Sequence, residues 1–275
     1  MRSWLYRGLA CSLLLGACPA QSDTISVDEV QQALEESALS SQAETLLSDG
    51  VEITTNFTIG EALERAAQEL QGFVAAQLPC ASITRDAAKL SVTYGAKAGN
   101  CSFHGHSFAG EHTVTVMRNA ANEVAVHHEW NAFNDGHVSI SGSADVMWSR
   151  TSKSRHVQHE ITWTMLSGRY VGQSGTGRGD RTQTALDSGL AVGMQVNGTR
   201  SWDGRHGHFD LDIDGVEMRW SDPVPQAGTY ELTTPRAGTL SLNFARISAN
   251  SIKVTAKSGP HEFAFTVMAD GQVQR

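Results

Sequence analysis

Apolar and polar residues alternate along most of the chain from about residue 88 onward. Leu90–Tyr94 and Ile161–Met165 are two examples. Successive side chains of a strand point to opposite faces, so a period of two predicts strands with one buried and one hydrated face. Turn signals such as Asn134-Asp135-Gly136 and Asp270-Gly271 separate these segments, which predicts an antiparallel meander. Roughly twelve to fifteen such strands rarely stay one flat sheet, so we expect a partial barrel or a sandwich.

Residues 26–79 precede the strands and carry helix signals. Ser26-Val27-Asp28-Glu29 has the spacing of a capping box. Apolar residues recur at helical spacing from Ile59 to Leu78. We expect the first helix to fade near Ser48-Asp49-Gly50 and the second to cover an open end of the sheet. The fold class is therefore mainly β (α+β), with N-terminal helices before the meander.

Acidic residues are concentrated in the helical segment. The chain has 21 basic and 29 acidic residues, a net charge of −8. Residues 18–79 hold eleven acids and one base (Arg65), a net charge of −10. Anionic lipid would repel this segment, so we expect a solvated spacer. No stretch is strongly basic, which disfavours nucleic acid as a partner.

The first residues have the features of an export signal. Arg2 and Arg7 give a basic start, and Leu9–Leu15 is an apolar run too short to span a bilayer. Small residues follow it in Leu15-Gly16-Ala17-Cys18. A basic start, a short apolar run and a small-residue cleavage site together predict a secretory signal and therefore an exported protein.

Leu-Gly-Ala-Cys also resembles the lipobox of bacterial lipoproteins. The resemblance covers residues 1–18 and implies cleavage before Cys18 and acylation of its thiol. The alternative is an ordinary signal peptide cut after Ala20. Pro19 stands where inner-membrane lipoproteins carry Asp, so the resemblance implies the outer membrane. In style, residues 88–275 are similar to envelope lipoproteins with long β-meander domains and no assigned function.

Two cysteines remain once Cys11 leaves with the signal and Cys18 takes the lipid. They are Cys80 and Cys101. Export permits a disulfide between them, which would contribute on the order of 3 kcal/mol in the chain-entropy model. Two free thiols are the alternative.

Residues 210–215 read Asp-Leu-Asp-Ile-Asp-Gly, the first half of a calcium-binding loop. Such a loop needs an acidic ligand at its twelfth position, where this chain has Ser221. A two-residue turn at Asp214-Gly215 instead gives a hairpin with all its apolar side chains on one face. We therefore predict a hairpin. It would place Asp212 opposite Glu217, where a weakly bound cation could relieve the repulsion.

Eleven histidines follow residue 103. His104 and His106, like His206 and His208, are two residues apart, and two such side chains on a strand share a face and could reach one metal ion. These four are the candidate ligands. A hairpin that pairs Val114 with Val126 would add His112 opposite His128. The alternative is ordinary polar-face histidines.

The sequence carries no recognisable catalytic motif. The run 172–177 does not match G-x-S-x-G. Arg178-Gly179-Asp180 matches an adhesion tripeptide by chance, within what we expect to be a glycine-rich loop. We therefore expect a non-enzymatic binding or structural module with an unidentified protein or glycan partner.

The predicted organisation has four parts. Residues 1–17 are the signal peptide and 18–25 a lipidated tether; 26–79 form the acidic helical segment and 80–275 the β domain. No cofactor is expected beyond the covalent lipid, with weakly held calcium or zinc as the alternative. Metal binding through the four candidate histidines is the second function considered, and a secreted hydrolase the third.

Overall fold

The computed structural model describes residues 25–55, 63–103, 105–118, 124–149, 152, 154–186, 192–219, 222–236 and 238–275. It has two helices, α1 (Val27–Thr55) and α2 (Leu63–Gln77). Sixteen strands follow in the described segments: β1 (Ser82–Asp86), β2 (Lys89–Tyr94), β3 (Ser102–Phe103), β4 (His106–Ser107), β5 (Ala109–Arg118), β6 (Val124–Asn134), β7 (Val138–Ser149), β8 (Ser154–Met165), β9 (Ser174–Ala185), β10 (Gly193–Gly204), β11 (Gly207–Arg219), β12 (Asp222–Thr234), β13 (Gly238–Ser248), β14 (Ser251–Ser258), β15 (His261–Met268) and β16 (Val273–Gln274).

Fourteen of these strands form one antiparallel sheet, and β3 and β4 form a separate two-stranded sheet. Strand order in the large sheet follows chain order from β1 to β16, so it is a pure meander. The mainly β fold is confirmed. All fourteen strands belong to one sheet, so the alternative of a sandwich of two sheets is wrong. The first and last strands of the sheet do not pair, so it does not close into a barrel.

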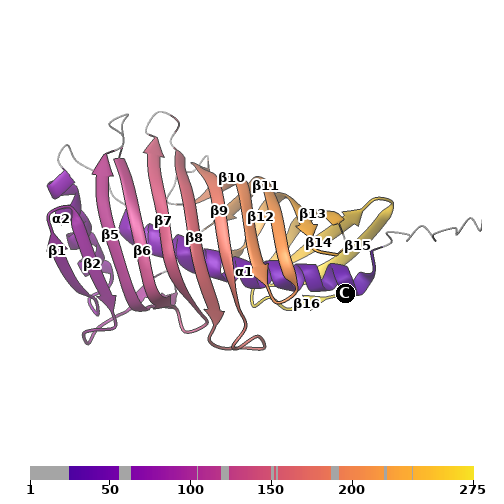
Figure 1. Ribbon diagram of the computed structural model, residues 1–275, viewed down its shortest axis with the longest axis horizontal. Helices are drawn as coiled ribbons and strands as arrows, with labels where there is room; N and C mark the ends of the chain where they lie inside the picture. The colour runs from indigo at the N-terminus through magenta and orange to yellow at the C-terminus, as the bar shows by residue number, and fades with distance from the viewer. Residues whose placement is uncertain are drawn as a thin grey trace, which may run out of the picture.

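Helix α1 lies along the inside of the curled sheet. Figure 1 shows it passing behind β5–β12, with β13–β15 on its other side. The capping box is confirmed, since the Glu29 carboxylate accepts from the Ser26 backbone N–H at 2.9 Å and the Ser26 Oγ accepts from the Glu29 N–H at 3.2 Å. The start of the second apolar recurrence, at Ile59, lies outside the described residues.

Two expectations about α1 are wrong. It continues to Thr55 instead of ending near Ser48–Gly50. A Cβ at Gly50 would lie 2.9 Å from the Trp130 indole nitrogen, so glycine here permits close packing of the helix on β6. Nor is the helix a solvated spacer, since Leu39, Leu46 and many of its other residues are buried. It is longer than α2 and covers the sheet over much of its width.

Two apolar clusters fill the space between the helices and the sheet. The first joins the C-terminal half of α1 and α2 to β1, β2 and β5–β8. The second joins the N-terminal half of α1 to β10–β16. No described helix is apolar over a stretch long enough to cross a bilayer.

The predicted hairpin at Asp214-Gly215 is wrong. Both residues lie inside β11, which pairs with β10 on one side and β12 on the other. The ladder with β10 shifts register between Val196 and Gly198, opposite Asp214 and Gly215. Gly215 has a φ of 58° and donates its N–H to the Asn197 side chain at 2.8 Å. The Asp-Gly pair thus makes an irregularity within a long strand, and Asp212 pairs with Thr199 and Glu231 instead of Glu217.

The disulfide between Cys80 and Cys101 is present, with the two Cα atoms 5.3 Å apart. It links the segment that follows α2 to the start of β3. Cys18 and the predicted signal peptide lie outside the described residues.

Candidate ligand-binding site

The first histidine pair is only partly visible in the structure. His104 lies outside the described residues, so its part in a metal site stays a prediction. His106 Nδ1 lies 3.3 Å from Asp135 Oδ2. A hydrogen bond to Asp135 raises the pKa of His106, and its partial burial opposes that shift.

The second histidine pair points in two directions. His206 lies in the turn before β11, and its Nδ1 is 2.6 Å from Glu36 Oε1 on α1. His208 lies on β11 and faces outward, with its Nδ1 2.9 Å from Asp203 Oδ1. The shared face expected of i and i+2 requires both residues to be in the strand, which His206 is not. Among the residues that the structure describes, no group of three or more His, Cys, Asp or Glu could hold a metal ion.

His112 and His128 do meet, although the expected register was wrong. Val116, not Val114, pairs with Val126, and His112 pairs with Trp130. The His112 Nε2 and His128 Nδ1 atoms are 3.0 Å apart, and both rings are buried beneath α1. Burial lowers the pKa of His112 to about 3 and that of His128 well below its ordinary value. The two rings are therefore neutral core groups at physiological pH.

Three buried glutamates of α1, eight residues apart, face basic side chains of the sheet. Glu36 contacts His206 as described above, and Glu52 forms an ion pair with Arg155 of β8. Glu44, between them, contacts both β8 and β9. We did not foresee these contacts, because acids on a helix are most often on its hydrated face.

The middle cluster is centred on Glu44. Its two carboxylate oxygens lie 2.8 Å from His159 Nε2 and 2.8 Å from Arg181 Nη2. Burial alone would raise the pKa of Glu44, but the charge of Arg181 and the contact with His159 outweigh it and hold the pKa well below the ordinary value. Glu44 is therefore an ionised carboxylate inside the fold.

Glycines of β9 make room for these side chains. The predicted loop around Arg178-Gly179-Asp180 is in fact this strand. A Cβ at Gly179 would lie 2.2 Å from the His159 ring, and a Cβ at Gly175 would lie 2.6 Å from the Trp163 ring. Alternating glycines in a strand signal such close approach, and this signal was available in the sequence.

Next to Glu44 the structure has a cavity of about 170 Å³ between α1 and strands β9–β15. Its sheet side is mainly apolar and includes Val196, Ile213, Leu242 and Val254, with Tyr230 among them. The cavity belongs to the second apolar cluster. An apolar cavity of about 150 Å³ in another protein stays dry and holds benzene, so this one has room for a small apolar group.

Apart from Leu34, Gln42 and Glu44, the helix side of the cavity is made of small residues. Ser37, Ala38, Ser41, Thr45 and Ser48 lie along one face of α1. The Ser41 hydroxyl donates to the Ser37 carbonyl at 2.7 Å, and the Thr45 hydroxyl to the Ser41 carbonyl at 3.0 Å. Because the helix satisfies the Ser41 and Thr45 hydroxyls, these two groups need no hydrogen-bond partner from an occupant.

Arg200 of β10 lines the same cavity and is 5% exposed. Its Nη2 donates to the Ser41 hydroxyl at 3.2 Å, and its guanidinium lies 4.9 Å from the centre of the Trp202 ring. Its Nε is buried and has no hydrogen-bond partner among the described residues. Burial lowers the pKa of Arg200, while the charge of Glu44 opposes that shift. In the sequence this arginine resembles a surface arginine. The one sign of its burial is its position two residues before a tryptophan in an alternating strand.

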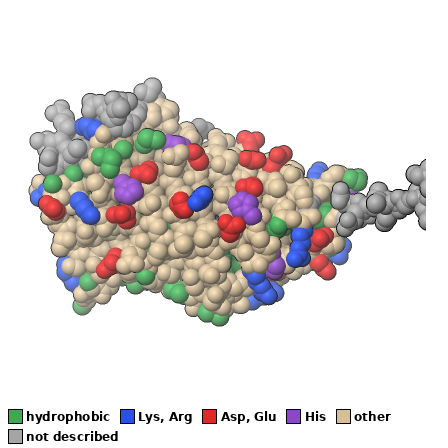
Figure 2. Space-filling model, viewed as in Figure 1, with side chains coloured by type: hydrophobic (Ala, Val, Ile, Leu, Met, Phe, Trp, Pro, Cys, Tyr) green, Lys and Arg blue, Asp and Glu red, His purple; other side chains and the backbone are tan. Residues whose placement is uncertain are grey.

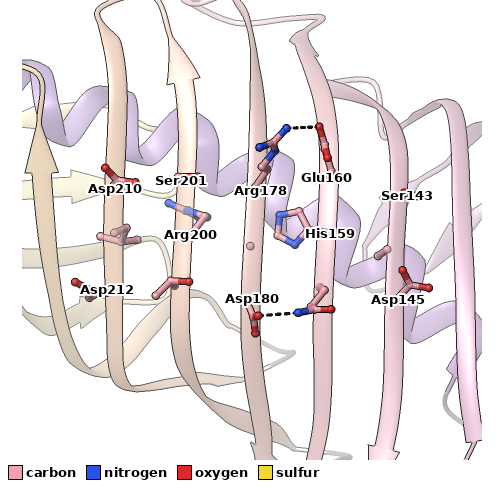
Figure 3. Close-up of a pocket in the computed structure, with 15 residues that line it drawn as sticks. Ser143, Asp145, His159, Glu160, Arg178, Asp180, Arg200, Ser201, Asp210 and Asp212 are labelled. Atoms are coloured by element: carbon pink, nitrogen blue, oxygen red, sulfur yellow. Dashed lines mark hydrogen bonds and ion pairs between the residues drawn. The ribbon is translucent and has the colours of Figure 1, made fainter. Parts of the chain in front are cut away.

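The outer face of the sheet carries a different, charged hollow of about 630 Å³ over β7–β11. Figure 2 shows acidic, basic and histidine side chains scattered over this face. In Figure 3, Arg178 pairs with Glu160, at 2.8 Å, and Asp180 accepts from the Gln158 amide at 2.7 Å. His159, in the same view, belongs to the other face of the sheet, the one toward α1. Since the outer charges largely pair with one another, the inner cavity is the stronger candidate site.

Comparison with protein-family models, with curated proteins and with solved structures finds no match to this chain.

Proposed function

We propose that this protein is a non-enzymatic binding module of the bacterial cell envelope, held at the membrane by a lipid on Cys18. Its ligand carries a small apolar group that is taken up between α1 and the curled sheet. The observation that supports this most is the apolar cavity of about 170 Å³ at that interface. The anchor is supported by the lipobox-like Leu15–Cys18, and Pro19 favours the outer membrane.

The packing around the cavity favours binding over a purely structural role. Protein interiors are close-packed, and voids larger than a water molecule are few. Empty apolar space costs stability, by about 24 cal/mol per Å³ in one mutational series. A chain that keeps Ser37, Ala38 and Ser41 opposite large apolar side chains therefore forgoes stability that larger residues would provide. Occupation by an apolar ligand recovers it.

A calorimetric titration with 1-hexanol tests this proposal. The protein is the mature chain (residues 18–275) carrying Cys18→Ala, so that no detergent competes for the site, with the Cys80–Cys101 disulfide intact. We expect saturable binding with one molecule per chain. Ala38→Phe, which fills the cavity from the helix, should abolish it.

The matched control is Ser143→Phe on β7, which adds the same ring at the outer hollow. This variant should bind 1-hexanol as the parent does. If the parent shows no saturable binding, or if Ala38→Phe folds with an unchanged circular dichroism spectrum and still binds, the cavity is not the ligand site.

A further inference from the structure

The cavity has an excess of positive charge at its polar end. Among the described residues that line it, three are charged: Glu44, Arg181 and Arg200. Arg181 lies 2.8 Å from Glu44 and balances it. Arg200 is then left with a serine hydroxyl and a tryptophan ring as its close contacts. A buried charge without an opposite charge in contact is costly to a fold.

We propose that the ligand is an anionic amphiphile, with a short alkyl or aryl tail in the cavity and a carboxylate against Arg200. The inference rests on the function proposed above and names the chemical class of its ligand. A carboxylate pairs with a guanidinium through two parallel hydrogen bonds. The Arg200 Nε, which is unpartnered and buried, supplies one such donor.

The protein side of this contact is already arranged. Arg200 is desolvated in the folded protein, so a carboxylate would meet it without further loss of water from the arginine. Its contacts with Ser41 and Trp202 hold the guanidinium in place. Tyr230 also lines the cavity, and burial raises the pKa of its phenol, so it stays a neutral hydrogen-bond donor.

The rest of the lining fits a tail rather than a second polar group. Beyond the charged end, the sheet contributes aliphatic side chains such as Ile213, Leu242 and Val254. A cavity of this size holds a group of about six carbons, by comparison with the benzene-binding cavity of similar volume. Hexanoate is therefore a suitable probe.

The test is a calorimetric comparison of sodium hexanoate, 1-hexanol and hexylammonium chloride, again with the mature Cys18→Ala chain. The three probes share a tail and differ in the charge of the head group. We expect hexanoate to bind about tenfold to a hundredfold more tightly than 1-hexanol, as hydrogen bonding to a charged group provides. Hexylammonium should bind more weakly than the alcohol, since its charge has the sign of Arg200.

Arg200→Met should weaken binding of hexanoate more than binding of 1-hexanol and so remove the preference, because methionine keeps an apolar chain of similar length and loses the charge. The matched control is Arg178→Met on β9, whose side chain is 71% exposed on the outer face. It should keep the full preference. The order of the three probes in the parent protein tests the inference even if Arg200→Met fails to fold.

The outcomes separate the two proposals. If hexanoate and 1-hexanol bind equally in the parent, or if the preference survives Arg200→Met, the anionic ligand is refuted while the apolar site stands. If none of the three probes binds, the proposed function fails, and this inference with it. A preference that Arg178→Met removes would place the anion on the outer face and would also refute the inference.

Discussion

The buried pair His112–His128 should make the fold sensitive to mild acid. In the unfolded chain both imidazoles take up protons near their ordinary pKa of about 6.5. In the folded protein burial lowers the pKa of His112 to about 3 and that of His128 well below its ordinary value. The unfolded state therefore binds more protons below pH 6.5, and stability falls as the pH is lowered.

The size of the effect follows from proton linkage. Each histidine that titrates only in the unfolded state gives a slope approaching 1.4 kcal/mol per pH unit. Between pH 8 and pH 5 the loss is about 2 kcal/mol for one such group and about 4 kcal/mol for the pair. That is a large part of the 5–15 kcal/mol that stabilises a typical domain. The contribution is fully present above pH 6.5 and is lost progressively toward pH 3.

Urea unfolding followed by tryptophan fluorescence, at several pH values from 5 to 8, measures this slope. His128→Phe preserves the stacking on Trp130, whose ring centre is 5.5 Å away, and should remove about half of the slope. Adding His112→Phe should remove most of the rest, whatever the absolute stability of the variants. If the double variant and the parent have the same slope, the two histidines are not the groups that titrate.

His208→Gln serves as the control for that experiment. The hydrogen bond with Asp203 raises the pKa of His208 in the folded state. Protonation of His208 therefore favours folding below pH 6.5, so its removal should make the loss of stability in acid slightly steeper. The side chain is 53% exposed, so this opposite change should be small.

Three further predictions concern α1, β9 and the anchor. Glu44→Gln should destabilise the fold by about 3–5 kcal/mol, because it leaves Arg181 as an uncompensated buried charge; a loss below 1 kcal/mol in urea unfolding would contradict the ion-pair description. Gly179→Ala should destabilise by about 1–3 kcal/mol through its clash with the buried His159 ring, whereas Gly177→Ala, whose Cβ would meet its nearest atom at 3.7 Å, should be tolerated in the same assay. Cys18→Ala should move the protein from the membrane to the soluble fraction and abolish incorporation of labelled palmitate; persistence of both would refute the anchor.

The strands were predictable because alternation is imposed by the strand itself. In a sheet with one buried face, the side chains along each strand alternate between buried and exposed. Leu90, Val92 and Tyr94 show this, since each is buried and their neighbours are exposed. The capping box of α1 was predictable for a similar reason, since it depends on residues three positions apart. Local rules of this kind do not specify how far a sheet curls or what fills its interior.

The Asp214-Gly215 prediction failed because two local structures share one signal. A tight hairpin turn and a bulge within a strand both favour glycine at positive φ. Here the choice was made by pairing with β10 and β12, which the sequence near residue 214 does not encode. Asn197-Gly198, another pair of residue types common in turns, forms the matching irregularity in β10.

The candidate site was hidden because its charged residues look ordinary one at a time. Glu44 is one of many acids on α1, and Arg181 and Arg200 come from different strands. The usable signal was position: His159 occupies the inward register of Val157 and Ile161, where an apolar residue is expected. A charged or polar residue in that register needs a buried partner, and the acidic helix was the one segment rich in opposite charge.

The position of α1 explains why the charged contacts are needed. A helix buried on most sides must keep one axial position and one rotation relative to the sheet. Apolar packing alone specifies a unique position weakly. On the face toward the cavity, Ala38 and Ser41 are too small to interlock with the strands. Glu36, Glu44 and Glu52 contact the sheet at three separate points along the helix, and each contact is lost if the helix shifts by one turn. The same contacts that fix the helix therefore also keep the space beside Ser41 from closing, which is what a binding cavity between a helix and a sheet requires.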